Sequence, residues 1–208
     1  MSVEEEFRSR WQACRHPPDT MPDVEPLLAR YREAHRHYHN AAHILDCLDQ
    51  LALYQTAAPD AAPSPDIAVS LFYHDVIYDP RAVDNEEQSA QFAWRHLAPH
   101  LPPEQIEAIT RLVRATDHRH PPVQADEQLI VDVDLSILGR DAATFDAYDR
   151  AIRAEYAHVP ADAYRAGRSQ VLQHFLSRPH LYYTPWFLEQ YEATARVNLQ
   201  QALQRLRA

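Results

Sequence analysis

The 208-residue sequence predicts an all-α protein that forms one compact multi-helix domain. Apolar residues recur at helical spacing through most of the chain, and convincing runs of alternating apolar and polar residues are absent. The length is sufficient for one substantial core, and no change in composition indicates a second. We therefore expect a single domain that spans residues 1–208.

Ten helices are expected, with the usual error of a few residues at each end. Prolines lie near several expected starts, where the missing N–H of proline costs no hydrogen bond. These prolines are Pro22, Pro65, Pro102, Pro103, Pro160 and Pro185. The expected helices span residues 3–15, 22–35, 41–56, 66–78, 85–98, 103–117, 125–138, 142–157, 161–178 and 185–206.

Two histidines flank the predicted start of helix 41–56. Asn40 is a natural N-cap, because its side-chain oxygen can accept from a backbone N–H in the first turn. His43 then lies in that turn beside an apolar stripe that includes Cys47. His39 precedes the cap at the same helix end, so both imidazoles are candidates for a functional role.

The stretch LFYHDVIYDP places His74 and Asp75 inside the apolar run of helix 66–78. An ionised carboxylate is costly to bury without a partner. Asp75 therefore requires a cation or a dense set of hydrogen bonds, and the chain must supply the other groups around it.

Three acidic residues, Asp84, Glu86 and Glu87, lie around the start of helix 85–98. Asp84 and Glu87 have the spacing of a capping box, which is an ordinary structural role for both. Glu86 shares a helical face with Ala90 and other apolar residues, so it is the acid expected to turn inward.

Two histidines follow helix 103–117. His118 and His120 could complement the negative end of this helix, or they could act as ligands. We keep His118 as a candidate for a second metal ion or for support of the ligands.

Helix 125–138 contains Asp132 and Asp134 in the apolar segment VDVDLS. Their β-branched neighbours could also form a strand, but a lone strand would have no sheet to join. On a helix the two carboxylates lie about 200° apart, so one can be solvated while the other requires a partner. Gly139 is expected to end the helix as a C-cap.

The last expected helix, 185–206, is amphipathic and serves packing. Its apolar stripe consists of Leu188, Tyr191, Ala195, Leu199, Ala202, Leu203 and Leu206.

Composition excludes several classes of protein. The only glycines are Gly139 and Gly167, so the chain has no Gly-rich phosphate loop and no Gly-x-Ser-x-Gly nucleophile motif. The net charge of −10 argues against binding of a nucleic-acid polymer but permits a small phosphorylated ligand. Two cysteines, Cys14 and Cys47, are too few for a disulfide framework, and no apolar run reaches membrane-spanning length. We expect a cytoplasmic protein that does not bind membranes.

Two imidazoles and two carboxylates form the predicted ligand set. They are His43, His74, Asp75 and one aspartate of residues 131–136. Mixed nitrogen and oxygen ligation without thiolates suits an open, catalytic site for Mn²⁺, Fe²⁺, Co²⁺, Ni²⁺, Zn²⁺ or Mg²⁺.

This ligand order resembles the HD superfamily of metal-dependent phosphohydrolases, which carry a His…His-Asp…Asp pattern on bundled helices. YHNAAH is similar to a segment of cyclic nucleotide phosphodiesterases, a resemblance that implies His39 as the general acid and His43 as a ligand. VDLS resembles the segment with their last metal ligand, which favours Asp134 over Asp132.

The longer matches RHYHN, FYHDVIYDP, DNEEQSA and DLSILG are similar to a small bacterial branch known as predicted HD phosphohydrolases. The chain is much shorter than the phosphodiesterase domain, and its last 60 or so residues contain no counterpart of the nucleotide-selecting region. The resemblance implies a metal-site core at about residues 36–140, with helices at about 142–206 packed on it.

The implied activity is hydrolysis of a small phosphate ester, with a nucleotide as the expected substrate. His39 would protonate the leaving oxygen, and Glu86 would orient or deprotonate the attacking water or support the site. Arg36, Arg153 and Arg168 are candidates for phosphate binding or for helix pairing.

Two other classes are open to test. One is a non-catalytic metal- or nucleotide-binding regulatory module on the same scaffold. The other is a ferritin-like di-metal bundle, which requires inward Glu-x-x-His pairs that this chain does not place in that way.

Overall fold

Ten α-helices and two short 3-10 helices form the secondary structure of the computed structural model, which describes residues 1–14 and 21–207. The all-α prediction is confirmed, because these described residues contain no strand. The α-helices are α1 (Val3–Ala13), α2 (Glu25–Tyr31), α3 (Ala41–Ala57), α4 (Asp66–Tyr73), α5 (Asn85–Leu97), α6 (Pro103–Ala115), α7 (Ala125–Asp134), α8 (Ala142–Glu155), α9 (Ala161–Ser177) and α10 (Pro185–Arg207). The 3-10 helices are η1 (Pro59–Ala61) and η2 (Leu135–Gly139). The predicted end of the first helix, at residue 15, lies outside the described residues.

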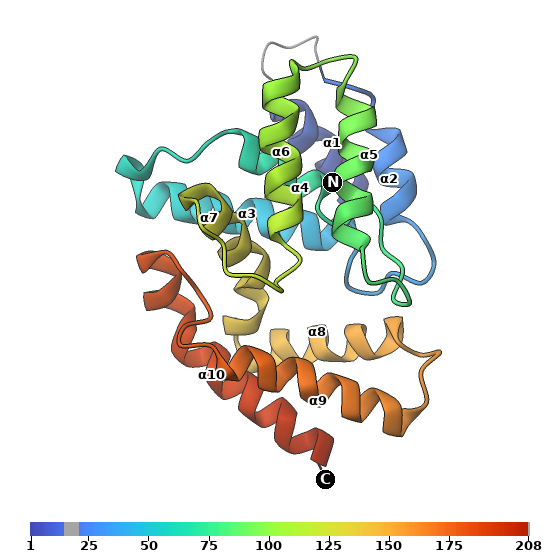
Figure 1. The fold of residues 1–208 in the computed structure, drawn as a ribbon, viewed down its shortest axis with the longest axis vertical. Helices are drawn as coiled ribbons and strands as arrows, with labels where there is room; N and C mark the ends of the chain where they lie inside the picture. The colour runs from blue at the N-terminus through green and yellow to red at the C-terminus, as the bar shows by residue number, and fades with distance from the viewer. Residues whose placement is uncertain (15–20, 208) are drawn as a thin grey trace.

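The helices form two groups that share α3 and α7 as a centre (Figure 1). α1, α2, α4, α5 and α6 lie in the upper part of the view, where α6 packs against both α4 and α5. α8, α9 and α10 lie in the lower part, and α10 packs against α9 and η2. The upper group and the centre supply the four predicted metal ligands.

One cluster of buried apolar side chains runs through both groups and makes them a single bundle. Phe7 of α1 meets Phe72 of α4 edge to face, with ring centroids 4.9 Å apart. Leu199 of α10 belongs to the same cluster and is also fully buried. Burial of large apolar side chains supplies most of the stabilisation of such a fold.

Helix α4 ends at Tyr73, five residues earlier than the expected end at residue 78. His74 is its C-cap, so the His-Asp pair lies at the helix end and not in its middle. The buried guanidinium of Arg36 donates to the carbonyl oxygens of Asp75 and Val76 at 2.6 and 3.0 Å. These carbonyls therefore have partners without a continued helix.

Helix α7 is also shorter than predicted, because the chain tightens into η2 after Asp134. Gly139 ends η2, but its φ is not positive, so the left-handed C-cap conformation is not the reason for a glycine. A Cβ at this position would lie only 2.5 Å from the Cβ of Tyr191 and 2.8 Å from the carbonyl oxygen of Tyr191. The glycine is required by the close approach of α10.

The predicted capping box at α5 is wrong. Asp84 is the N-cap, but its side chain accepts from the amide of Gln88 and caps no backbone N–H. The carboxylate of Glu87 pairs with Arg114 of α6 at 2.6 Å. Glu87 therefore joins α5 to α6 and does not cap α5.

No helix in the described part of the chain is long and apolar enough to cross a membrane.

Candidate metal centre

Two imidazoles and two carboxylates converge where α3, α4 and α7 meet. The Nε2 atoms of His43 and His74 lie 3.2 Å apart. An oxygen of Asp75 lies 3.1 Å from Nε2 of His74 and 3.6 Å from Nε2 of His43. An oxygen of Asp134 lies 3.1 Å from Nε2 of His43 and 3.4 Å from Nε2 of His74. The structure thus brings together a group that could hold a metal ion.

Local sequence positions each of these side chains at a helix end. The side-chain oxygen of Asn40 accepts from a backbone N–H of α3 at 2.9 Å, which confirms the predicted cap and places His43 in the first turn. His74 and Asp75 leave the end of α4, and Asp134 is the last residue of α7. Three helix ends therefore meet around the group.

The ring of His74 is oriented by the backbone. Its Nδ1 lies 2.9 Å from the carbonyl oxygen of Leu71, which can only accept, so Nδ1 carries a proton. This arrangement leaves Nε2 facing the carboxylates, as is usual for a histidine that binds a metal.

The charges within the group are strongly coupled. Burial alone lowers the pKa of His74, but the carboxylates of Asp75 and Asp134 raise that pKa well above its ordinary value. Burial would raise the pKa values of both carboxyls, yet the imidazoles hold them below the usual range. Both aspartates are thus ionised at neutral pH. A divalent cation could supply the positive charge in place of protons on the imidazoles.

Cys47 touches the group and is part of the buried core, as the sequence predicts. Its sulfur lies 3.7 Å from both ring nitrogens of His43. Without a metal ion, burial raises the pKa of the Cys47 thiol well above its ordinary value, and the nearby aspartates act in the same direction. With His43 and Asp134, Cys47 forms an alternative group that could also hold a metal ion.

Solvent access suits an open site. The side chains of Asp75 and Asp134 are each 14% exposed, whereas those of the two histidines are at most 2% exposed. The carboxylate side therefore faces solvent, from which a small ligand could approach. Nitrogen and oxygen donors in such a group match divalent transition metals and Mg²⁺.

His39 lies beside this group and is held by Glu155, the last residue of α8. One oxygen of Glu155 accepts from the backbone N–H groups of His37, Tyr38 and His39 at 2.9, 2.7 and 2.9 Å. The other oxygen lies 2.7 Å from Nδ1 of His39. Glu155 is 4% exposed, so a buried carboxylate fixes both the loop and the imidazole.

Tyr78 completes this arrangement. Its ring stacks on His39 with centroids 4.1 Å apart, and its hydroxyl donates to Glu155 at 2.9 Å. Burial lowers the pKa of His39, but Asp75 and Glu155 more than compensate, so this pKa is raised. Burial acts to raise the pKa of Glu155, while the bond from His39 lowers it to about 2. The pair therefore favours a protonated imidazole whose Nε2 is free to donate elsewhere.

Arg36 is structural and is not available to a phosphate. Its side chain is fully buried and donates to the carbonyl oxygens of His39, Asp75 and Val76. It also pairs with Glu33 at 3.0 Å. Arg36 thereby joins the loop of His39 to the segment that carries Asp75.

The other two candidate arginines hold helices together. Arg153 donates to the carbonyl oxygens of Tyr156 and Val159 after the end of α8. Arg168 of α9 donates to the hydroxyl of Tyr148 and pairs with an oxygen of Asp149 at 3.0 Å, both on α8. Of the two roles predicted for these arginines, helix pairing is the one that the contacts support.

Glu86 is half-buried in the first turn of α5. Burial raises the pKa of its carboxyl, and the charge of Asp75 adds to this effect. A hydrogen bond from its own backbone acts in the opposite direction. Glu86 thus lies partly buried near the group.

His118 approaches the group from the loop after α6. Its Nε2 lies 2.9 Å from an oxygen of Asp134, and its φ of 56° is left-handed. The guanidinium of Arg178 donates to the carbonyl oxygen of His118. The Nδ1 atom of His118 is buried and has no partner among the described residues. His120 is exposed and does not join the group.

Asp132 has a different role from Asp134. It is fully buried, and its two oxygens accept from the backbone N–H groups of Tyr183 and Thr184 at 2.8 and 2.7 Å. Burial raises its pKa to about 7. The expectation that one of the two aspartates is solvated is wrong, because Asp132 joins α7 to the start of α10.

Sequence reasoning does not identify Glu155 or Tyr78 as residues of the site. It names Arg36 for phosphate binding or helix pairing, and not for the support of two loops that the structure shows. An acid in the last turn of a helix, where a negative charge is unfavourable, is the one sequence signal that could have indicated Glu155.

Comparisons with protein-family models, with curated proteins and with solved structures found no significant match. Fold and site together define a class: an all-α protein with a buried His/Asp group that could hold a metal ion. Its function is inferred from its own residues.

Proposed function

We propose that this protein is an HD-type metal-dependent phosphohydrolase that cleaves a phosphate ester of a small molecule. The observation that carries the proposal is the convergence of His43, His74, Asp75 and Asp134 beside the histidine that Glu155 holds. The resemblance to the HD superfamily is carried by the same residues in the same order.

His43, His74, Asp75 and Asp134 would hold the metal ion. A bound divalent ion would lower the pKa of a water molecule and offset charge on phosphoryl oxygens. The solvent-facing carboxylates leave one side of the group open for a phosphate.

His39 would act as the general acid. Glu155 holds Nδ1, so the protonated ring directs Nε2–H toward the leaving oxygen. The carboxylate of Glu155 favours the protonated form of His39. A metal-binding module without catalysis has no need of this second arrangement.

Glu86 and His118 would act at the edges of the group. The half-buried carboxyl of Glu86 can orient a water molecule or accept its proton. His118 either supports Asp134 or contributes to a second metal ion, and its unpartnered Nδ1 is compatible with both roles.

The proposed substrate is a small phosphorylated molecule, with a nucleotide as the leading candidate. The net charge of −10 disfavours a nucleic-acid polymer. A small phosphate ester requires only the local positive charge that a metal ion supplies.

The experiment that tests this function is a panel of phosphomonoesters, phosphodiesters and nucleotides, offered to protein loaded with Mn²⁺, Co²⁺ or Ni²⁺. We expect turnover that is lost by about 100-fold in His39→Asn, which keeps its metal, and that is unchanged in exposed His100→Asn. Stoichiometric metal binding without turnover on any substrate would instead identify a regulatory module.

A further inference from the structure

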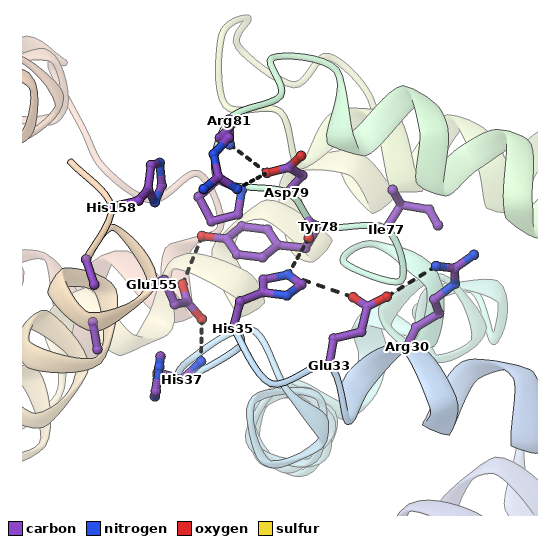
Figure 2. A pocket seen from close by; sticks show the side chains of 13 residues that line it. Arg30, Glu33, His35, His37, Ile77, Tyr78, Asp79, Arg81, Glu155 and His158 are labelled. Carbon is purple, nitrogen blue, oxygen red and sulfur yellow. Dashed lines mark hydrogen bonds and ion pairs between the residues drawn. The ribbon is translucent and has the colours of Figure 1, made fainter.

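A concavity has Glu155 and Tyr78 among its lining residues (Figure 2). It has a volume of about 590 Å³ and lies between the loop before α3, the segment after α4 and the end of α8. Among the described residues, neither His39 nor any of the four candidate metal ligands lines it. The pocket is therefore separate from the metal group. Two of its lining residues, Glu155 and Tyr78, nevertheless contact the proposed general acid, His39.

The carboxylates of this pocket are already used. Glu33 accepts from Arg36 at 3.0 Å and from Arg30 at 3.2 Å. Both oxygens of Glu155 are occupied by backbone N–H groups, by His39 and by Tyr78. The third carboxylate, Asp79, accepts from the backbone N–H of Arg81 at 2.9 Å and lies 4.0 Å from its guanidinium. Each carboxylate in the walls therefore has at least one donor or cation beside it.

Arg81, His37 and His158, by contrast, have few partners or none. The side chain of Arg81 is 68% exposed, and its guanidinium reaches the nearest carboxylate, Asp79, only at 4.0 Å. The imidazoles of His37 and His158 are exposed and have no hydrogen-bond partner within the described ranges. Figure 2 shows Arg81 and Tyr78 above His35, with His158 facing them from the end of α8.

We propose that this pocket binds a small oxyanion, either a phosphate or a carboxylate, through Arg81 and His158, with His37 at the other end of the pocket. A guanidinium and imidazole N–H groups are suitable donors for such an ion. The volume suits a small ligand, and Tyr78 and Ile77 supply apolar surface for its body. A ligand here would contact Glu155 and Tyr78, so it could act on His39 without entering the metal group.

Calorimetry of the metal-loaded protein with inorganic phosphate and, separately, with succinate tests the proposal. NMR signals of the His37 and His158 imidazoles locate the binding. We expect one of the anions to shift these signals, and Arg81→Gln combined with His158→Asn to weaken that binding by about tenfold. Response to only one anion would identify which oxyanion chemistry the pocket takes.

Matched changes away from the pocket, Arg150→Gln with His100→Asn, should leave the affinity unchanged. All four of these residues are exposed, so the fold is retained, and each single pocket variant can be measured alone. Shifts confined to His39 and His43, or equal affinity in the double variant, would overturn the proposal. The readout is binding, so it stands apart from whether the protein hydrolyses any ester.

Discussion

Asp75 is a partly buried carboxylate and Glu155 a fully enclosed one, and their surroundings differ. Glu155 is surrounded by donors from three backbone N–H groups, His39 and Tyr78. The side chain of Asp75 has only the imidazoles of His43 and His74 within ion-pair distance in the described part of the chain. A dense set of hydrogen bonds therefore compensates the charge of Glu155. The charge of Asp75 has fewer partners and favours a bound cation.

Glu155→Gln tests the support of the general acid. The change removes the negative charge that raises the pKa of His39, so this pKa falls. The proposed mechanism requires protonated His39, so the rate would decline as pH rises through the pKa of His39. The decline therefore begins at lower pH in the variant, and kcat/KM on the alkaline side is reduced by about tenfold.

A pH profile of hydrolysis and an NMR titration of His39 measure this effect. Glu104→Gln, at an exposed position of α6, is the control and should change neither the pH profile nor the titration curve of His39. Superimposable profiles for Glu155→Gln and the wild type would show that Glu155 has no influence on the acid.

At the scale of elements, two of the contacts that fix α10 to the half with the candidate metal ligands involve η2 and α7. Gly139 of η2 allows the close approach of Tyr191, and Asp132 of α7 accepts from the N–H groups before α10. Asp132 lies two residues from the candidate ligand Asp134. The packing of α10 is therefore linked, through η2 and α7, to the position of the candidate ligand Asp134.

The two glycines of the chain give a matched pair of predictions. Gly139→Ala should lower the free energy of unfolding by about 1–3 kcal/mol, because the new Cβ would clash with the backbone of α10. Gly167→Ala should raise it by about 0.5–1 kcal/mol, since a Cβ there meets nothing within 4 Å and favours the helix. Urea denaturation measures both, and effects of the same sign would contradict this packing.

Asp132→Ala should destabilise the protein by about 2–4 kcal/mol, because it leaves two backbone N–H groups without an acceptor. Asp162→Ala, at a side chain that is 90% exposed, is the control and should change the free energy of unfolding by less than about 0.5 kcal/mol. A loss for Asp132→Ala as small as that of the control would remove the proposed link between α7 and α10.

At the scale of the whole molecule, local patterns predicted the helices and the order of candidate ligands. Periodicity, prolines and the Asn40 cap act over a few residues, so a single sequence reveals them. Glu155 lies 116 residues from His39, and its place at a helix end, although unusual for an acid, does not indicate His39 as its partner. For the same reason, the early end of α4, which depends on distant Arg36, and the packing role of Gly139 could not be predicted.

Metal content tests the central claim most directly. Protein purified after exposure to Mn²⁺, Co²⁺ or Ni²⁺ should contain at least about one ion per chain, because two imidazoles and two carboxylates converge. Asp75→Ala should remove nearly all of that ion, while Asp162→Ala should retain it. Equal metal content in Asp75→Ala and the wild type, measured by elemental analysis, would contradict the assignment of this group as the metal centre.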